Sequence, residues 1–203
     1  MSAIPYTVDR RPDTGVNNVQ LGMWLFLASE AMLFAGLFSA YFMLRAGAAE
    51  PWLPLRGHLA SAGTSTFVLF AGTAGFVAAV RAARAKRELP LWGGVMAFRV
   101  MLFASSLFAL SFCALKLSDY ASLSEAGLGP ATSTRMAVYF LLTGVHLVHV
   151  AGGLLVNLAL LLTSPGTWRD APLLVVNRLE ALALYWYFVD AVWLIVFVLL
   201  YVV

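Results

Sequence analysis

The chain has 203 residues, of which 62% are hydrophobic and only 11% are charged. Soluble globular domains have about 45–50% and about 25% of these classes, so we expect an integral membrane protein. The formal net charge of +3 is small and the basic residues lie between the apolar runs, which is typical of membrane orientation and not of nucleic-acid binding. The single cysteine, Cys113, excludes an intrachain disulfide.

Five apolar windows follow one another along the chain. Each is long enough to cross a hydrocarbon core, which takes about 20 residues. A lipid-facing segment must satisfy its own backbone hydrogen bonds, so each window is predicted to be a helix, and continuous apolar runs exclude a barrel of short alternating strands. The prediction is an all-α polytopic bundle of five transmembrane helices, at about 19–45, 57–83, 91–117, 134–163 and 178–203.

The polar segment 1–18 contains no apolar stretch of the kind that signal peptides carry, so the first helix is expected to act as the insertion signal. No long linker divides the chain, and residues 1–203 are expected to form one membrane domain. Lys and Arg are more numerous on one side of the membrane, which predicts a cytoplasmic N-terminus and an outside C-terminus. The two sets are Arg10, Arg11, Arg81, Arg84, Lys86, Arg87, Arg169 and Arg178 against Arg45, Arg56, Lys116 and Arg135.

Glu30 is the only charged residue in the first apolar window. At about 1.5 Å per residue, it lies roughly 15–18 Å from the cytoplasmic end of its helix. Asp190 in the last helix lies at a similar depth, and His146 and His149 lie roughly 15–22 Å from the outer end of the fourth helix. All four groups are therefore expected near the membrane midplane, with the histidines as i,i+3 neighbours on one helix.

An ionised group at mid-membrane costs at least about 2.5–3.5 kcal/mol, so these four side chains are expected to have partners. We predict that Glu30 shares a hydrogen-bonded proton with His149. His146 and Asp190 are expected nearby, or bonded to backbone and hydroxyl groups such as that of Thr143. Two roles are open for this buried polar cluster: it can lock helices together, or it can hold protons.

Two histidines on one helix also raise the question of a metal or haem site. Such a site needs ligands on facing helices at one depth, and the remaining histidine, His58, lies at the end of the second helix. The Glu-x-x-His motifs of a di-metal site do not occur, nor does a Gly-rich phosphate loop or a nucleophile motif. We therefore assign no metal ligand, no cofactor-binding residue and no catalytic residue to this chain.

Arg99 is a cation about two turns into the third helix. Its side chain is expected to extend to the cytoplasmic interface. The alternative is an ion pair with an acid near the same membrane face, such as Glu180.

Three sequence motifs together carry a resemblance to a known family. Residues 24–34 read WLFLASEAMLF, residues 142–154 read LTGVHLVHVAGGL, and residues 185–193 read YWYFVDAVW. These runs resemble subunit III of the haem-copper respiratory oxidases, whose pattern is WLF-x-x-SE-x-M, then TG-x-H-x-x-HV-x-GG, then YWHFVD-x-VW. The resemblance extends from about residue 19 to the end and fits the five-helix bacterial form.

The resemblance implies an accessory subunit of a bacterial proton-pumping oxidase, with no active site of its own, in the inner cell membrane. Haem and copper are then expected in partner subunits, above all the catalytic subunit I, and structural phospholipid and other membrane lipids are expected on this chain. The family role is to support proton uptake and to protect the catalytic centre during oxygen reduction to water, with electrons from cytochrome c or quinol. Glu30, His146, His149 and Asp190 match its buried polar residues.

One departure concerns Tyr187, which stands where the family usually has histidine. A phenol has an ordinary pKa near 10 and a histidine one near 6.5, so this change weakens a proton relay through the last helix. Two other functions remain open: an accessory subunit of a nitric oxide reductase, and an independent small proton carrier or transporter. The sequence shows no inverted repeat or broken helix of the kind that transporters carry.

Overall fold

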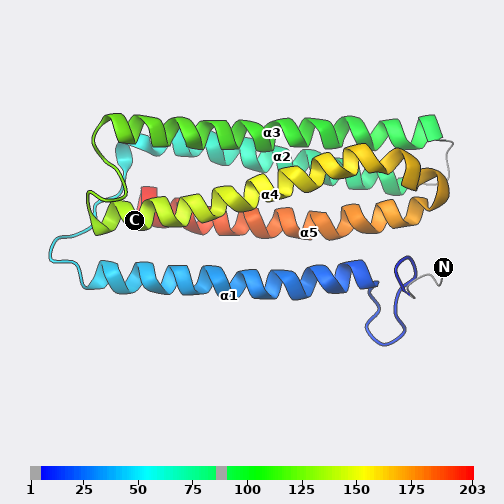
Figure 1. The fold of residues 1–203 in the computed structure, drawn as a ribbon, viewed down its shortest axis with the longest axis horizontal. Helices are drawn as coiled ribbons and strands as arrows, with labels where there is room; N and C mark the ends of the chain where they lie inside the picture. Colours follow the sequence, from blue (N-terminus) through cyan, green and yellow to red (C-terminus); the bar gives the residue numbers. More distant parts are fainter. Residues whose placement is uncertain (1–5, 86–90) are drawn as a thin grey trace.

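The computed structural model describes residues 6–85 and 91–203, and all of the regular secondary structure in these ranges is helical (Figure 1). Five helices there are long and apolar enough to cross a membrane, as the sequence predicted. They are α1 (Asn18–Ala46), α2 (Leu59–Ala85), α3 (Leu91–Glu125), α4 (Thr134–Asp170) and α5 (Pro172–Phe197), with a short 3-10 helix at Arg56–His58 and a π-helical turn at Val198–Val202.

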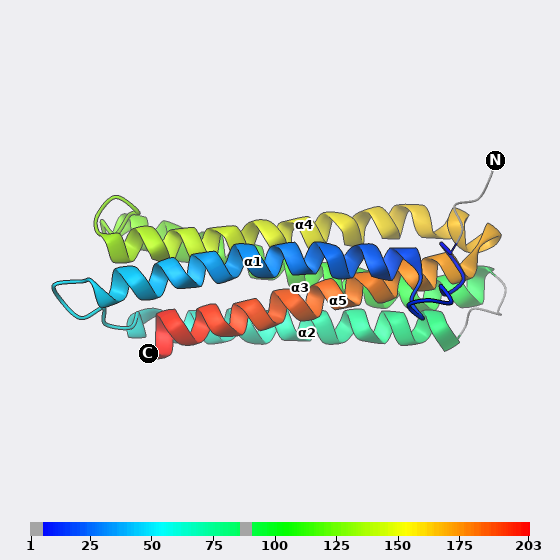
Figure 2. The same cartoon turned by 90° about the horizontal axis from the view of Figure 1, so that it is seen from below.

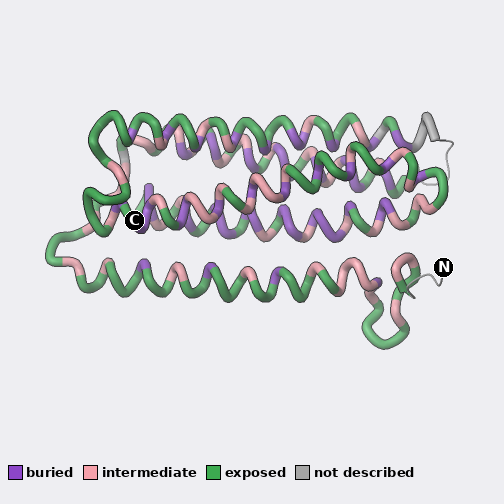
Figure 3. The backbone as a smooth tube through the Cα atoms, viewed as in Figure 1, coloured by how far each residue is buried: buried purple, intermediate pink, exposed green. Residues whose placement is uncertain are grey.

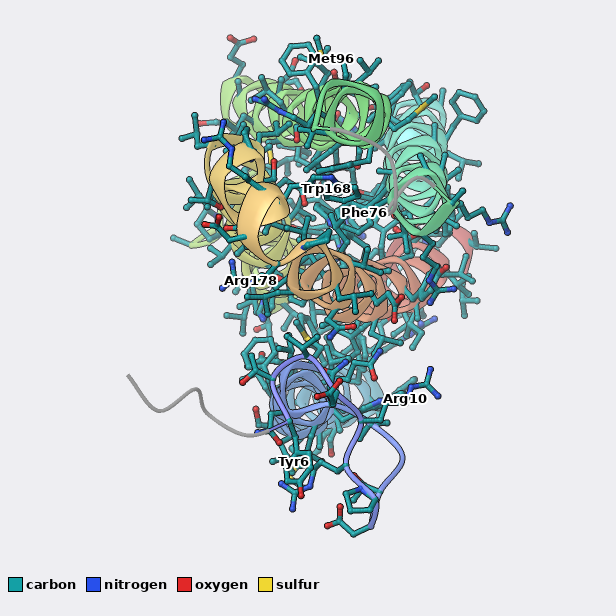
Figure 4. The ribbon with its side chains drawn as sticks, turned by 90° about the vertical axis from the view of Figure 1, so that its right-hand side faces the viewer. Tyr6, Arg10, Phe76, Met96, Trp168 and Arg178 are labelled. Atoms are coloured by element: carbon teal, nitrogen blue, oxygen red, sulfur yellow. The ribbon has the colours of Figure 1, made fainter. Side chains whose placement is uncertain are left out.

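Helices α2, α3, α4 and α5 form a closed ring, in which each helix packs on the next and α5 returns to α2. Helix α1 lies outside this ring, against α5 and to a smaller extent α4 (Figures 1 and 2). The end-on view shows the same division, with Phe76 and Trp168 directed into the ring (Figure 4). We call the four helices the four-helix unit and the contact with α1 the α1 seam.

Burial follows this arrangement (Figure 3). Half of the residues in the most apolar stretch of α5 are buried, because this helix contacts α1, α2 and α4. In the most apolar stretch of α1, only 11% of the residues are buried. The buried side chains of α1 are Leu27, Phe34 and Tyr41, which recur every seven residues and so lie on one helix face. The remaining surface of α1 is apolar and exposed, as expected of a helix that borders lipid or another membrane subunit.

Two glycines lie at tight contacts between helices of the four-helix unit. A Cβ atom on Gly72 of α2 would lie 3.0 Å from Cβ of Phe108 on α3. On α4, a Cβ atom on Gly153 would lie 2.8 Å from Cε1 of Tyr185 and 3.0 Å from Cζ2 of Trp186. Small residues at such points allow backbones to approach closely where lipid supplies no hydrophobic driving force.

Helices α3 and α4 end later than the sequence predicted, and α5 begins earlier, at Pro172 instead of about residue 178. Helix α3 continues from the predicted end at about residue 117 to Glu125, and α4 continues from about 163 through Pro165 to Asp170. The extension of α4 buries Trp168, whose ring centroid lies 5.1 Å from that of Phe98 on α3. Packing of this kind outweighs the loss of one backbone hydrogen bond at a proline. Helix α5 then begins at Pro172, a position where proline is well tolerated.

The π-helical turn at Val198–Val202 ties the end of α5 to its neighbours. The carbonyl of Leu199 accepts a hydrogen bond of 2.8 Å from the Tyr41 hydroxyl of α1. The carbonyl of Leu200 accepts one of 3.1 Å from the backbone N–H of Leu55. These carbonyls lie in the last turn of the helix, where no intrahelical N–H remains to donate to them. This turn therefore fastens α1 and the α1–α2 connection at one end of the bundle.

Candidate functional site

Glu30 and His149 form an ion pair across the α1 seam. Oε2 of Glu30 lies 2.8 Å from Nε2 of His149, which confirms the predicted pairing. On its other side, Nδ1 of His149 lies 2.7 Å from the backbone carbonyl of Val145, one turn earlier in α4. A carbonyl oxygen only accepts hydrogen bonds, so Nδ1 carries a hydrogen and donates it.

This geometry fixes how the pair holds a proton. With a hydrogen on Nδ1, the neutral imidazole of His149 has a bare Nε2, which is an acceptor. A carboxylate is also an acceptor, so a hydrogen bond between Nε2 and Oε2 requires one further proton between them. The pair is therefore either imidazolium with carboxylate or neutral imidazole with carboxylic acid. In both forms Glu30 and His149 share one proton.

The pair lies at the junction of three helices. The Phe34 ring of α1 lies 5.1 Å from the His149 ring, and the Tyr185 hydroxyl of α5 donates a 2.7 Å hydrogen bond to the His149 backbone carbonyl. The side chains of His149 and Glu30 are 13% and 16% exposed, so they are shielded but reachable from the outer edge of the seam. The arrangement can hold helix α1 in place and retain a proton near the middle of the helices.

His146 faces a different part of the molecule. Its side chain is fully buried, and Nε2 lies 3.1 Å from the backbone carbonyl of Val189 on α5. Its ring packs on Trp193 and Phe112, at centroid distances of 5.0 and 5.6 Å. This is the backbone-bonded arrangement that the sequence left open, and His146 belongs to the core of the four-helix unit.

Asp190 is also part of that core. Only 6% of the residue is exposed, and it lies beside Thr73 of α2. Its Oδ1 atom has no hydrogen-bond partner within the described ranges 6–85 and 91–203. The structure therefore brings Glu30 and His149 together, but hydrogen-bonds neither His146 nor Asp190 to them. The four residues predicted as one cluster divide into one pair and two separate core groups.

A second ion pair, which the sequence reading missed, lies inside the four-helix unit. Nζ of Lys116 lies 2.7 Å from Oδ2 of Asp119, one turn further along α3. The Lys116 side chain is completely buried and that of Asp119 is 8% exposed. The Ser61 hydroxyl of α2 donates to the other oxygen of Asp119, so the carboxylate is held from two helices.

Aromatic residues complete the surroundings of Lys116. Its ammonium group lies 5.0 Å from the ring centroid of Trp193 and 5.4 Å from that of Tyr201. The Tyr201 hydroxyl is 3.4 Å from Nζ of Lys116 and 2.9 Å from the hydroxyl of Tyr139 on α4. Cation–π contacts and hydrogen bonds of this kind compensate in part for taking the ammonium group out of water.

The third helix was predicted to end at about residue 117, directly after Lys116, so the burial of this residue was not predicted. The residue follows an apolar run and was counted among the charges that orient the chain, but it is helical and buried. A signal was present in the sequence. Lys116 and Asp119 have the i,i+3 spacing of neighbours on a helix face, and the first glycine after them is Gly127.

A third polar group joins α1, α2 and α5 at the end of the bundle that carries the N-terminus. Glu180 accepts hydrogen bonds from Gln20 at 3.0 Å and from Nε of Arg84 at 2.6 Å. Glu180 is therefore already paired, and Arg99 makes no ion pair with it. Tyr187 is half-exposed and lines a cavity of about 320 Å³ beside Glu180 and Arg84, on a different part of the α5 surface from the Glu30–His149 pair.

No group of three or more His, Cys, Asp and Glu side chains within residues 6–85 and 91–203 is arranged to hold a metal ion. The polar groups that join helices are Glu30 with His149, Asp119 with Ser61, and Glu180 with Gln20 and Arg84.

Comparison with known proteins identifies the family. The family model described as cytochrome c oxidase subunit III matches residues 94–203, which include the histidine motif of α4 and the aromatic motif of α5. The chain is 32% identical to a probable cytochrome c oxidase subunit 3 of Mycobacterium bovis, over 91% of this chain and 88% of the relative. A relative with the same description from Nocardia farcinica is 33% identical over 92% and 89%.

Two further relatives extend the comparison. The cytochrome bo(3) ubiquinol oxidase subunit 3 of Pseudomonas aeruginosa is 29% identical over 95% of this chain and 88% of its own length. A haem-copper oxidase subunit I+III of Aeropyrum pernix is 31% identical over 92% of this chain, which corresponds to 23% of that longer protein. With its five membrane-spanning helices and the motifs around Glu30, His149 and Asp190, the chain belongs to the cytochrome c oxidase subunit III family.

Proposed function

We propose that this chain is the accessory subunit III of a proton-pumping haem-copper terminal oxidase in the inner membrane of a bacterium. The observation that carries this proposal is the similarity to oxidase subunits 3 over about nine-tenths of the chain. The complex would reduce oxygen to water with electrons from cytochrome c or quinol. Haem and copper would reside in partner subunits and supply the redox chemistry there.

The catalytic subunit I is the proposed main partner. The Aeropyrum pernix protein that matches this chain is named subunit I+III, and the matching part makes up about a quarter of it. In that protein the two subunits share one name and one chain, which supports a direct association of the separate forms. Helix α1 has an apolar surface that no other helix of this chain covers over the described residues, so it is available for such a contact.

We propose that the end of the bundle with Gln20, Arg84 and Glu180 is cytoplasmic. Arg81 and Arg84, in the last turns of α2, lie at this end beside Glu180. Because Lys116 is buried inside the bundle, it does not count among the positive charges at the opposite end. The excess of Lys and Arg at the end with Arg84 is therefore larger than the count from the sequence.

The role proposed for the Glu30–His149 pair is to fasten α1 and to retain a proton near the proton entry of the catalytic subunit. Because the two side chains share one proton, the pair stays formed whether the charge is separated or neutralised. Structural phospholipid on this chain would add to the stability of the assembly. Together these features support the lifetime and the proton uptake of the complex without a reaction on this chain.

The decisive experiment is co-purification. We expect the affinity-tagged protein, extracted in mild detergent, to bring down a haem-bearing subunit whose reduced-minus-oxidised visible spectrum is that of an oxygen-reducing oxidase. A complex that reduces nitric oxide and not oxygen would instead favour the nitric oxide reductase alternative. Protein without haem that conducts protons by itself in liposomes would overturn the proposal in favour of an independent carrier.

The role of Glu30 has its own test in the same complex. Glu30→Ala should leave the initial turnover rate nearly unchanged but shorten the active lifetime or slow proton uptake. Ser29→Ala is the matched control, because its hydroxyl bonds only to the carbonyl of Phe26 in its own helix. Equal lifetimes, proton uptake and assembly in the two variants would remove a functional role for Glu30.

A further inference from the structure

An apolar groove of about 570 Å³ lies between α3 and α4, on the opposite side of the four-helix unit from α1. It runs along the half of these helices that includes the start of α3 and the end of the apolar part of α4. Met96, at the shallow end of the groove, points outward from α3 in the end-on view (Figure 4). The lining residues are Met96, Arg99, Val100, Phe103, Leu158, Leu161 and Leu162.

Arg99 is the one charged residue among those that line the groove. Within the described part of the chain it makes no ion pair or hydrogen bond, and the nearby acid Glu180 is already bonded to Gln20 and Arg84. Arg99 lies about two turns from the start of α3 at Leu91, and from there a long Arg side chain extends toward the level where lipid headgroups meet hydrocarbon. A cation at that level favours a phosphate as its counter-charge.

The rest of the groove fits a hydrocarbon chain. From the level of Arg99 it passes along Val100 and Phe103 on α3 and Leu158 on α4, all of which are exposed. No polar side chain among the lining residues interrupts this path toward the middle of the helices. The groove therefore combines one cation at the headgroup level with an apolar channel directed into the membrane.

We propose that this groove binds one anionic glycerophospholipid, with its phosphate on Arg99 and an acyl chain along Val100, Phe103 and Leu158. The inference deepens the lipid-holding role within the proposed function, because it names the site and the headgroup class. The proposed lipid site requires only that the chain spans a membrane, and it lies away from the α1 seam.

The test measures lipid retained by the purified protein, with any subunits that co-purify, after exchange into nanodiscs of phosphatidylglycerol and phosphatidylethanolamine. Native mass spectrometry of the released complex gives the retained ratio of the two lipids. Arg99→Gln should lower the preference for phosphatidylglycerol by about fivefold, which corresponds to about 1 kcal/mol for one basic residue at the membrane surface. Arg81→Gln is the control, because it removes an equal charge from α2, beside a different cavity.

A second variant tests the apolar part of the site. Leu158→Trp should fill the channel and lower retention of both lipids without changing their ratio, whereas Leu155→Trp alters an exposed residue of α4 outside the lining and should do neither. Equal effects of Arg99→Gln and Arg81→Gln, or unchanged retention with Leu158→Trp, would overturn the proposal. The visible spectrum of each preparation reports separately on the oxidase assignment, so a failure of one inference is distinguishable from a failure of the other.

Discussion

The four-helix unit contains the buried ion pair of Lys116 and Asp119, the α1 seam contains the partly buried pair of Glu30 and His149, and the two pairs are built differently. Lys116 and Asp119 are three residues apart on α3, whereas Glu30 and His149 are 119 residues apart on two helices. Their separations are nearly equal, at 2.7 and 2.8 Å. A pair within one helix can form without tertiary structure, which then only buries it. A pair between helices exists only because the fold brings its members together.

The surroundings of the two pairs differ as well. Lys116 has no exposed side-chain surface and is enclosed by aromatic rings, whereas Glu30 and His149 remain partly reachable at the edge of the seam. An unpaired charge is more costly where water cannot reach it. The pair in the four-helix unit is therefore expected to matter most for stability, and the pair at the seam most for the attachment of α1 and for proton retention.

The largest expected effect is that of Lys116→Met, which leaves the Asp119 carboxylate buried without its cation. The free energy of unfolding should fall by about 3–5 kcal/mol, measured by titration of mixed micelles with a denaturing detergent and followed by circular dichroism. The double variant with Asp119→Leu removes both charges and should recover most of that loss. If the double variant is as unstable as the single one, the ion pair is not the source of the effect.

Packing within the four-helix unit should give the next largest effect. Gly153→Ala places a Cβ atom 2.8 Å from Tyr185 and should lower the free energy of unfolding by about 1–3 kcal/mol. A Cβ atom on the neighbouring Gly152 would lie 3.9 Å from the nearest atom, and a Cβ atom on Gly36 of α1 would have no atom within 4 Å. Alanine at either of these control positions should be neutral or slightly stabilising in the same titration. Similar losses at all three sites would erase the contrast in packing between the two regions.

At the α1 seam, a double-mutant cycle with Glu30→Ala and His149→Ala measures the coupling of the pair. We expect a coupling free energy of about 0.6–1.7 kcal/mol, the range found for polar contacts between membrane helices. The detergent titration supplies the four stabilities of the cycle. A coupling near zero would mean that the pair does not fasten α1, and only its proton-holding role would remain.

The smallest expected effect is that of Tyr41→Phe, which removes the hydrogen bond to the Leu199 carbonyl and the hydroxyl that accepts from Arg45. The loss of stability should be about 0.6 kcal/mol. Hydrogen exchange of residues 47–55 should become faster, because the π-helical turn then holds α1 less firmly. Exchange spread equally over α2 and α3 would instead point to a general loosening of the four-helix unit.

Much of the fold could be predicted from hydropathy, but the ends of α3 and α4 and the start of α5 could not. The apolar windows identify the five spans because the cost of exposing backbone to lipid depends on each segment by itself. The continuation of α4 past Pro165 depends instead on the contact between Trp168 and Phe98, which come from different helices. Local signals for a helix end were present there and were overridden by packing.

The candidate site likewise has features that the sequence predicted and features that only packing between helices decides. The depth of Glu30 and His149 follows from counting residues along straight helices, and it was enough to predict their hydrogen bond. Depth does not say which way a side chain points around the helix axis. His146 and Asp190 face the core of the four-helix unit, and the sequence could not separate them from the pair.

The sequence by itself determined that this protein is a five-helix membrane protein of the oxidase subunit III type with a buried acid–histidine pair. These properties depend on composition, spacing and motif, which are local. Only the tertiary structure decided that α1 stands outside a ring of four helices, that Lys116 is a core residue, and that Arg99 lines an apolar groove. The physical reason is that burial and pairing depend on how helices are rotated against one another, and that rotation is set by side-chain packing between distant segments.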